Sequence, residues 1–485
     1  MSKAGKTRRY EARPFEHIPA DAIILGFTGF LGSGCSYISK GFRELSHDTW
    51  LRFKMADVIR ESLADKGIKS PTVVQMQDEG DRLRHRSDGK LIAYRTLDAI
   101  NDDPCIQTRA DAKKECIILV DGLKNDAEVR VFRQFANFFL IAVHASDERR
   151  CARLIDDETI KNGEEFAVIR ERELQGDDPL GQQVEKCNYL ADIIVTNEED
   201  IAKKNDAARK EFLGGLVRMY VDLIVKRCFG QPSYDRPPTV DEMMMTVAYC
   251  ASRSSSCKKR QVGAVIAKVE KPEGHEQARP HEKDGIQRAT IVSSGYNEVP
   301  PGAKPCVLDT RYEGCYRDWL QEKGAAQVKN CPTCGKPVAY PKECPSGSCG
   351  KPLERHVKYC PACGKDVFSS VVCGCGTKPL LEGPLFGKHT SSKMMDVCRS
   401  LHAEETAILN MAKEGIAPQE EFVLYTTTYP CPLCANKIAA LQIKRVVYAE
   451  VYTMPEAQEI LESAGVTVDR FTGVKSTAYF KLYGR

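Results

Sequence analysis

The chain has 485 residues, of which 42% are hydrophobic and 28% are charged. This length exceeds that of one ordinary domain, and the apolar content is sufficient for separate packed cores. The formal net charge of +3 argues against a dedicated nucleic-acid binder, because such proteins usually carry a strong basic excess. No apolar run approaches the ~20 residues of a membrane helix, and the N-terminal stretch lacks a signal-peptide pattern. We therefore expect a cytoplasmic protein without membrane contact.

Residues 1–20 are a basic tail, and residues 21–230 show short apolar runs separated by charged stretches of helical period. The expected strands cover residues 22–26, 116–120, 138–143 and 192–195, and a long helix is expected over residues 206–226. Strands that alternate with helices predict a parallel sheet covered on both faces. Prolines then mark residues 231–238 as a linker, since proline cannot continue a helix.

A glycine-rich turn follows the first expected strand and precedes a helix. Residues 29–36 read Gly-Phe-Leu-Gly-Ser-Gly-Cys-Ser, which fits the phosphate-loop pattern except that cysteine replaces the lysine. Main-chain amides of such a loop bind phosphate, and a serine and an aspartate near it can hold the Mg²⁺ of a bound nucleotide. The predicted nucleotide site consists of Gly29, Gly32, Ser33, Gly34, Cys35, Ser36 and Asp121. Because the lysine charge is missing, we expect a regulatory nucleotide site rather than an active kinase; a structural remnant is the alternative.

Residues 239–485 begin with a helix, which Thr239 and Glu242 start as a capping box. Strands are expected over residues 262–269, 290–295, 422–425 and 445–451, with helices after Leu401 and from Pro455. Residues 307–397 interrupt this pattern as a cysteine-rich insertion. The fold class is therefore α/β, with a parallel-sheet domain followed by a second α/β/α domain that contains an insertion.

Two short motifs in the second domain carry the predicted chemistry. His402 and Glu404 open one helix, and Cys431 and Cys434 stand at the start of the next. One imidazole and two thiolates provide three of the four tetrahedral bonds of zinc, which leaves one position open for water. This order, His-x-Glu and then Pro-Cys-x-x-Cys, is the zinc-deaminase signature. We assign the proton shuttle to Glu404, which would activate the water, protonate ring N3 of cytosine and protonate the leaving amino group.

The cysteine-rich insertion has the spacing of zinc knuckles. The simplest assignment is two structural zinc ions, each bound by four cysteines, and crossed pairing is the alternative. The predicted ligands are Cys331, Cys334, Cys344, Cys349, Cys360, Cys363, Cys373 and Cys375. The insertion either stabilises a segment that is too small for its own core, or gates the site, or binds a partner or another subunit.

The second domain resembles the deoxycytidylate deaminase family. The resemblance includes residues 251–254 and 260–266, the loop of residues 294–300 and the strand before the cysteine motif, residues 425–427. It implies a sugar contact for Asn297 and phosphate contacts for Arg253, Ser254 and Arg260, and Ala403 is expected to line the substrate site. An ordinary turn residue is the alternative for Asn297, and surface solvation is the alternative for the arginines. Many members have glycine where this chain has Glu298, which puts the phosphate-length preference in doubt.

The first domain resembles P-loop nucleotide kinases, and the two halves together resemble bacterial antiviral deaminases of deoxycytidine nucleotides. That resemblance implies deamination of dCTP and dCMP to dUTP and dUMP, depletion of the deoxycytidine nucleotide pool, and a resting-state inhibitor that is RNA in some members. It also implies a homo-oligomer. The alternatives are a housekeeping dCMP deaminase that supplies dUMP for thymidylate synthesis, and a polynucleotide cytosine deaminase whose zinc ribbons bind nucleic acid.

Overall fold

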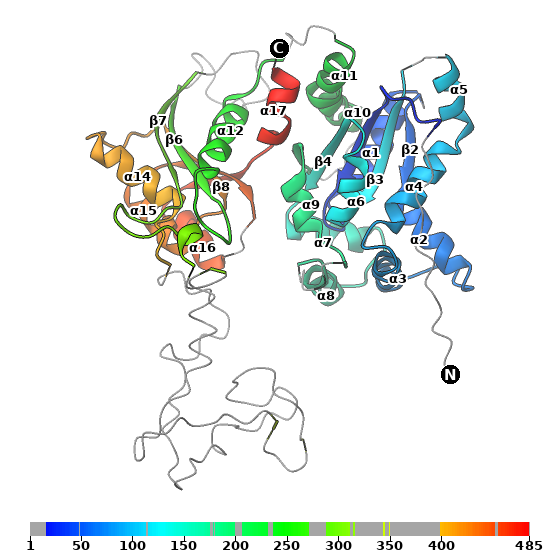
Figure 1. Ribbon diagram of the computed structural model, residues 1–485, viewed down its shortest axis with the longest axis horizontal. Coiled ribbons are helices and arrows are strands. Elements are labelled where there is room, and N and C mark those ends of the chain that lie inside the picture. Colours follow the sequence, from blue (N-terminus) through cyan, green and yellow to red (C-terminus); the bar gives the residue numbers. More distant parts are fainter. Residues whose placement is uncertain are drawn as a thin grey trace.

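A computed structural model gives the fold of most of the chain. It describes residues 16–47, 49–112, 115–174, 178, 180–198, 206–230, 236–270, 288–310, 314–315, 343–344, 349, 398–451 and 454–484. In these ranges the chain forms two α/β bodies that lie side by side (Figure 1). None of the helices in the described ranges has the length and apolar character to cross a membrane.

The first body is built on a six-stranded sheet in the order β11-β5-β4-β1-β3-β2. Its strands are β1 (Ile23–Thr28), β2 (Leu51–Lys54), β3 (Ile117–Leu123), β4 (Phe138–His144), β5 (Ile193–Thr196) and β11 (Gly473–Val474). All neighbours are parallel except β11, which runs antiparallel to β5. This confirms the predicted parallel sheet and its four apolar strands. The edge strand β2 was not predicted, because its half-buried sequence Leu-Arg-Phe-Lys has no apolar run.

Helices cover both faces of this sheet. They are α1 (Cys35–Leu45), α2 (Met55–Ala64), α3 (Val73–His85), α4 (Leu91–Asn101), α5 (Pro104–Ala112), α6 (Asp126–Phe132), α7 (Asp147–Asp156), α8 (Gly163–Leu174), α9 (Val184–Leu190), α10 (Asp206–Leu216) and α11 (Asp222–Cys228). A π-helical turn, η2 (Val217–Val221), joins α10 to α11. Alternate residues of β1 enter opposite apolar cores: Ile24 packs in the core of α2 and α4, whereas Ile23 and Leu25 pack against α1 and α10.

The second body is built on a five-stranded sheet in the order β10-β9-β8-β6-β7. Its elements are α12 (Val240–Ser252), β6 (Gly263–Val269), β7 (Ala289–Tyr296), the 3₁₀ turn η3 (Cys306–Leu308), α14 (Ala403–Lys413), β8 (Phe422–Thr428), α15 (Pro432–Ala440), β9 (Arg445–Glu450), α16 (Pro455–Ser463), β10 (Thr467–Arg470) and α17 (Ser476–Tyr483). Helix α12 packs on one face, and α14, α15 and α16 contribute to the core of the other. The described part of this body therefore has the predicted three layers.

Two glycines allow helices to approach the second sheet closely. A Cβ atom at Gly263 would lie 1.9 Å from the carbonyl oxygen of Ala248 in α12, and one at Gly295 would lie 2.3 Å from the amide nitrogen of Ala407 in α14. Glycine is thus required at both positions by the neighbouring main chain. The contact at Gly295 fixes the height of α14 over the sheet, and α14 carries the first of the two predicted metal-site motifs.

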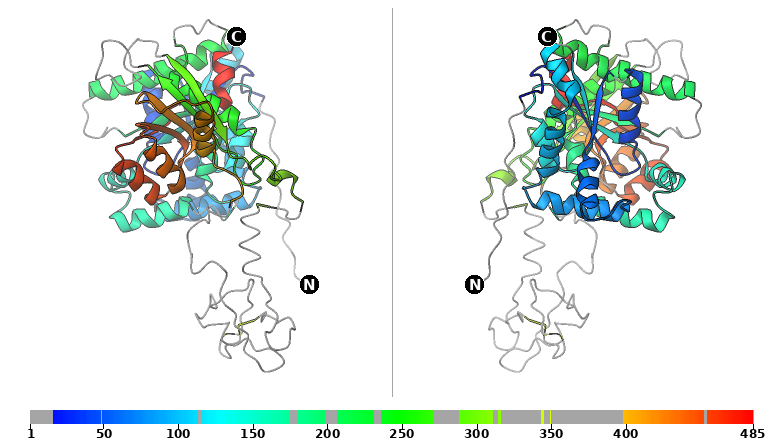
Figure 2. Two further views of the ribbon diagram at one scale, coloured as in Figure 1. Left: turned by 90° about the vertical axis from the view of Figure 1, so that its left-hand side faces the viewer. Right: turned by 90° about the vertical axis from the view of Figure 1, so that its right-hand side faces the viewer.

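The last part of the chain returns to the first body. Strand β11 pairs with β5, and Val474, Ala478 and Leu482 pack in the apolar core formed by α1, α10 and α11. Helix α17 lies between α11 and α12 (Figures 1 and 2). The sequence did not predict this arrangement, in which residues from the end of the chain complete the first sheet.

Candidate active site

The two motifs of the second body meet at the ends of two helices. His402 directly precedes α14, and Cys431 directly precedes α15, with Cys434 in the first turn of that helix. The Nδ1 atom of His402 lies 3.2 Å from Sγ of Cys431 and 3.4 Å from Sγ of Cys434. All three ligand atoms lie within 4.8 Å of one another, so these residues can hold one metal ion. The donor set of one imidazole nitrogen and two sulfurs fits tetrahedral zinc.

The electrostatics of the cluster favour a cation. The hydrogen bond with Cys434, aided by that with His402, lowers the pKa of Cys431 to about 4 against the effect of burial. The hydrogen bond with Cys431 raises the pKa of His402. The hydrogen bond between the two thiols, in which Cys434 keeps its proton, raises the pKa of Cys434. Both sulfurs are nearly inaccessible to solvent. A divalent metal ion would stabilise both thiolates at once, because its charge replaces the shared proton.

Glu404 lies beside this cluster without belonging to it. Its side chain is 4% exposed. One carboxylate oxygen accepts a hydrogen bond from Oγ1 of Thr426 at 3.0 Å, and the other lies 3.5 Å from Sγ of Cys434. Burial raises the pKa of Glu404, which suits a carboxyl group that must both accept and donate a proton near neutral pH. Thr426 comes from β8, so the sheet fixes the orientation of the carboxylate.

The first body contains a cavity of about 950 Å³ at the carboxyl ends of its parallel strands. Six of the seven predicted nucleotide-site residues line its wall: Gly29, Gly32, Gly34, Cys35, Ser36 and Asp121. Oγ of Ser36 donates a hydrogen bond to Asp121 at 2.6 Å, and Arg52 forms an ion pair with the same carboxylate oxygen at 2.6 Å. Magnesium binding at this pair would therefore require Arg52 to move.

Ser33 lies beneath the loop rather than in the cavity wall. Its side chain is 1% exposed, and its carbonyl oxygen accepts a hydrogen bond from Nδ2 of Asn197 at 2.8 Å. The loop ends at Gly34, whose φ of 101° starts α1. A side chain at Gly34 would also strike Nδ2 of Asn197. Asn197 therefore holds the loop from below, a role that the sequence did not indicate.

Comparison with known proteins assigns the two bodies separately. The family model "Cytidine and deoxycytidylate deaminase zinc-binding region" matches residues 238–450. The chain contains a deoxycytidylate deaminase domain. It is 25% identical over 235 residues to a deoxycytidylate deaminase of Schizosaccharomyces pombe, a match that covers 48% of this chain and 44% of that protein. It is 29% identical over 229 residues to the deoxycytidylate deaminase of phage T2, which covers 46% of this chain and 88% of that protein.

The first body belongs to the family of UPF0200 proteins. It is 30% identical over 179 residues to the UPF0200 protein of Methanoregula boonei, covering 36% of this chain and 87% of that protein.

Among solved structures, the apo dCMP deaminase of cyanophage S-TIM5 has 18% identity and a TM-score of 0.22, with coverage of 49% of this chain and all of that one. The chain covers less than half of the fission yeast relative.

In the deaminase domain, Asn297, the predicted sugar contact, forms hydrogen bonds within the protein. Its Oδ1 accepts a hydrogen bond from the amide of Val262 at 2.8 Å, and its Nδ2 donates one to the carbonyl oxygen of Arg260 at 2.9 Å. The next residue, Glu298, forms a bridge with Leu401, directly before His402. Asn297 thus fixes its loop to residues 260–262, and a sugar contact would use the remaining N–H and lone pair.

The other predicted substrate residues differ in exposure. Arg253 ends α12 and is exposed, as is Ser254, whereas Arg260 is half-buried. Ala403 is fully buried in the core with Ala407, which leaves only its main chain for a substrate contact. Sequence reasoning missed Thr426, although three consecutive threonines at the end of an apolar strand are a signal of polar groups gathered at a site.

Of the eight predicted ribbon cysteines, six lie outside the described residues: Cys331, Cys334, Cys360, Cys363, Cys373 and Cys375. Cys344 is buried and Cys349 is half-buried, and neither forms a disulfide. The two structural zinc ions therefore stay a prediction.

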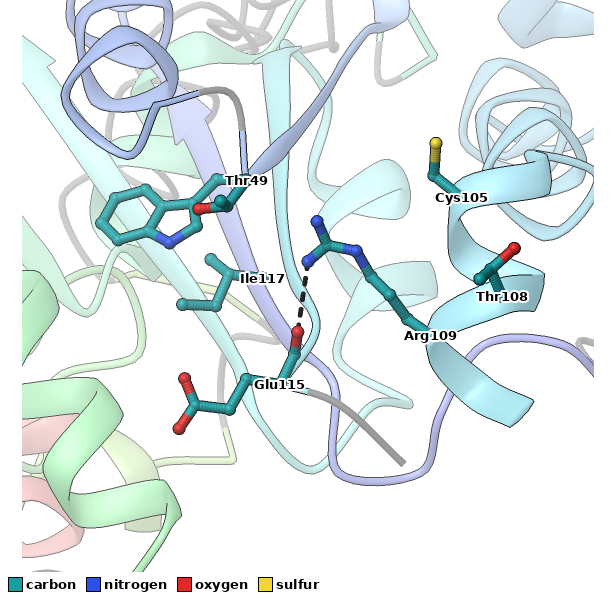
Figure 3. A pocket seen from close by; sticks show the side chains of 7 residues that line it. Thr49, Cys105, Thr108, Arg109, Glu115 and Ile117 are labelled. Atoms are coloured by element: carbon teal, nitrogen blue, oxygen red, sulfur yellow. Dashed lines mark hydrogen bonds between the residues drawn. The ribbon is translucent and has the colours of Figure 1, made fainter. Parts of the chain in front are cut away.

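A second pocket of about 600 Å³ lies in the first body at the amino ends of β2 and β3, opposite the phosphate loop (Figure 3). Thr49, Cys105 and Arg109 line it, and Arg109 donates a hydrogen bond to the carbonyl oxygen of Glu115 at 3.2 Å. Open α/β sheets bind ligands at the carboxyl ends of their strands. This rule favours the cavity at the phosphate loop over the second pocket as the place of the predicted nucleotide site.

Proposed function

We propose that this protein removes the amino group of cytosine from free deoxycytidine nucleotides by hydrolysis. The substrates are dCTP or dCMP, and the products are dUTP or dUMP and ammonia. The observation that carries the proposal is the convergence of His402, Cys431 and Cys434 with the buried carboxylate of Glu404 beside them. The match to deaminases of deoxycytidylate supports the class of substrate.

Three side chains would hold zinc: His402, Cys431 and Cys434. Zinc at this site supplies Lewis-acid activation of water. Glu404 would accept one proton from the water and give it to N3 of the base while the water oxygen bonds to C4. It would then take the second proton from that oxygen and give it to the amino group as the C4–N bond breaks, so water and cytosine become uracil and ammonia. The hydrogen bond from Thr426 keeps the Glu404 carboxylate turned towards the cluster.

Replacement of the proton shuttle tests this mechanism. Glu404→Gln preserves the shape of the side chain but cannot transfer a proton, so we expect turnover of dCMP and dCTP to fall by about 10²–10⁴-fold. The zinc content, measured by atomic emission, should stay at the wild-type level because the three ligands are intact. Glu414→Gln is the matched control, since Glu414 is exposed at the end of the same helix. Wild-type turnover by the Glu404 variant would remove the proposed role.

We also propose that deamination serves antiviral defence by depleting the deoxycytidine nucleotide pool. The combination of a deaminase domain with a second, phosphate-loop domain supports this role, because production of dUMP alone requires no such domain. The further proposals are a cytoplasmic homo-oligomer, two structural zinc ions in the insertion, a regulatory nucleotide with Mg²⁺ at the phosphate loop, and an inhibitory RNA.

The housekeeping alternative is favoured by the relatives, which are themselves named deoxycytidylate deaminases. Nucleotide pools of bacteria that express the wild-type protein or the Glu404→Gln variant distinguish the two roles. Loss of dCTP only in infected wild-type cells supports defence. A steady rise of dUMP that is independent of infection supports supply of dUMP and contradicts the defence role.

A further inference from the structure

The phosphate loop of the first body has free donors for an anion. Within the described residues, the amide N–H groups of Gly32, Gly34 and Ser36 have no hydrogen-bond partner. Gly34 and Ser36 stand at the start of α1, an eleven-residue helix whose dipole adds positive potential. These free amide groups indicate a phosphate-binding site, but neutral amides alone do not balance the negative charge of a polyphosphate.

Two buried polar atoms in the same cavity indicate that more than phosphate binds. Oε1 of Gln77 and Oδ1 of Asn197 are buried and have no hydrogen-bond partner among the described residues, and both side chains line the cavity. Buried carbonyl oxygens of this kind require an N–H or O–H donor. The amino group of a base and the hydroxyl of a sugar are such donors. The cavity of about 950 Å³ also has the size of a site for a whole nucleotide.

The side chain at the lysine position of the loop carries no charge. Burial raises the pKa of Cys35 to about 12, so its thiol is neutral at physiological pH. Its sulfur lies 3.6 Å from Oγ of Ser33. Cys35 therefore cannot neutralise a phosphate, and any cation for that purpose must come from another element.

Lys124 directly follows β3, and its side chain contacts the phosphate loop. Its Nζ donates a hydrogen bond to the carbonyl oxygen of Gly29 at 2.7 Å, at the first residue of the loop. The side chain is 21% exposed and lines the cavity. The ammonium group is thus already fixed at the mouth of the loop, in contact with the loop main chain.

Glu173 holds Lys124 in this position. Its carboxylate lies 3.2 Å from Nζ of Lys124, accepts a hydrogen bond from the amide of Leu31 at 2.9 Å, and pairs with Arg150 at 2.8 Å. Glu173 is 2% exposed. Because Arg150 also neutralises this carboxylate, Lys124 retains positive charge for a ligand.

We propose that Lys124 supplies the cation that the loop lacks at Cys35, and that the cavity binds a nucleoside triphosphate with its phosphates between Lys124 and the amides of Gly32, Gly34 and Ser36. This inference rests on the proposed nucleotide site of the first body and not on deamination. The cavity lining also contains cations, such as Lys54 and Arg153, and carboxylates, such as Asp156 and Asp157.

Binding of inorganic tripolyphosphate, measured by calorimetry on the full chain, tests the role of Lys124. We expect Lys124→Ala to weaken binding by about tenfold to a hundredfold, because a charge-assisted contact is lost. Lys186→Ala is the matched control and should bind as wild type does, since Lys186 is an exposed lysine of α9 outside the cavity lining. ATP should bind more tightly than tripolyphosphate, because its base and sugar reach Gln77 and Asn197.

A second variant, in which the positive charge is moved to another residue, tests whether Lys124→Ala loses binding only because it misfolds. The double variant Cys35→Lys with Lys124→Ala carries the cation at the lysine position of the loop, and we expect it to regain most of the lost affinity. Equal binding by wild type and Lys124→Ala would overturn the inference while the nucleotide site stands. Absence of tripolyphosphate binding to the wild type would overturn the nucleotide site itself. The proposed deamination would stand after either result, because it rests on the other body.

Discussion

Single buried charges reveal where the two bodies of the protein depend on each other. Lys475, between β11 and α17, is 1% exposed, and its Nζ donates a hydrogen bond to the carbonyl oxygen of Tyr189 at 2.7 Å. The same ammonium lies 5.2 Å from the ring centroid of Tyr249 in α12. Burial lowers the pKa of Lys475 to about 8, although Glu450 and Asp192 act in the opposite direction. A residue from the end of the chain thus joins α9 to α12 in a site that disfavours its charge.

This buried lysine predicts a pH dependence of stability. The pKa of Lys475 is about 8 in the folded protein, against an ordinary value of 10.5 for a lysine side chain in water, so the unfolded chain binds more protons between these two pH values. The free energy of unfolding should therefore rise with pH from about 8 to 10, by at most about 3 kcal/mol from this group. In Lys475→Met this contribution should be absent. Urea unfolding of both proteins at pH 7.5, 9 and 10 measures it, and parallel pH profiles would contradict the assignment.

The proposed metal ligands and the proposed proton shuttle could be predicted from single residues, because short motifs encode them. His402 with Glu404 and Cys431 with Cys434 are local pairs, and the structure brings both pairs together. Lys124 could not be predicted in the same way, since its role depends on a contact with Gly29, ninety-five positions earlier. One signal was available: a loop that lacks its lysine requires another cation, and Lys124 follows directly after strand β3.

At the scale of elements, Glu242 shows how a local signal acquires a long-range role. It forms the capping box of α12 with Thr239, as predicted. It also pairs with Arg236 at 2.6 Å and accepts hydrogen bonds from the amide of Val474 and the hydroxyl of Tyr483. Its side chain is fully buried. One carboxylate therefore joins the start of α12 to β11 and α17, and no periodic pattern encodes such contacts.

The two-residue strand β11 is an element whose loss is testable. Val474 is fully buried, pairs with Ile193 of β5, and packs in the core of the first body. We expect Val474→Asp to lower the free energy of unfolding by at least about 2 kcal/mol, because a carboxylate would enter an apolar core. Val168→Asp is the control, since Val168 is 64% exposed. If both variants unfold at the wild-type temperature, β11 does not stabilise the first sheet.

At the scale of the whole molecule, the two bodies share one continuous apolar core. The cluster extends from Leu140 and Ile194 of the first sheet through Met244 and Met245 of α12 to Val447 of the second sheet. The two folds were largely predictable from the sequence, because their central strands are apolar runs, although the edge strand β2 is not. The packing of one against the other was not predictable, because it depends on surface complementarity between distant segments. The proposed ligand at the phosphate loop would therefore bind to a body that is packed directly against the deaminase domain.

The proposed conversion of free deoxycytidine nucleotides by the deaminase domain is tested most directly by one measurement. Purified wild-type protein is incubated with dCTP, dCMP, cytidine and a cytosine-containing single-stranded DNA, and uracil products and ammonia are quantified. We predict ammonia and the matching deoxyuridine nucleotide from dCTP, dCMP or both, with little product from cytidine or DNA. Product from the oligonucleotide alone, or from none of the four substrates, would contradict this account.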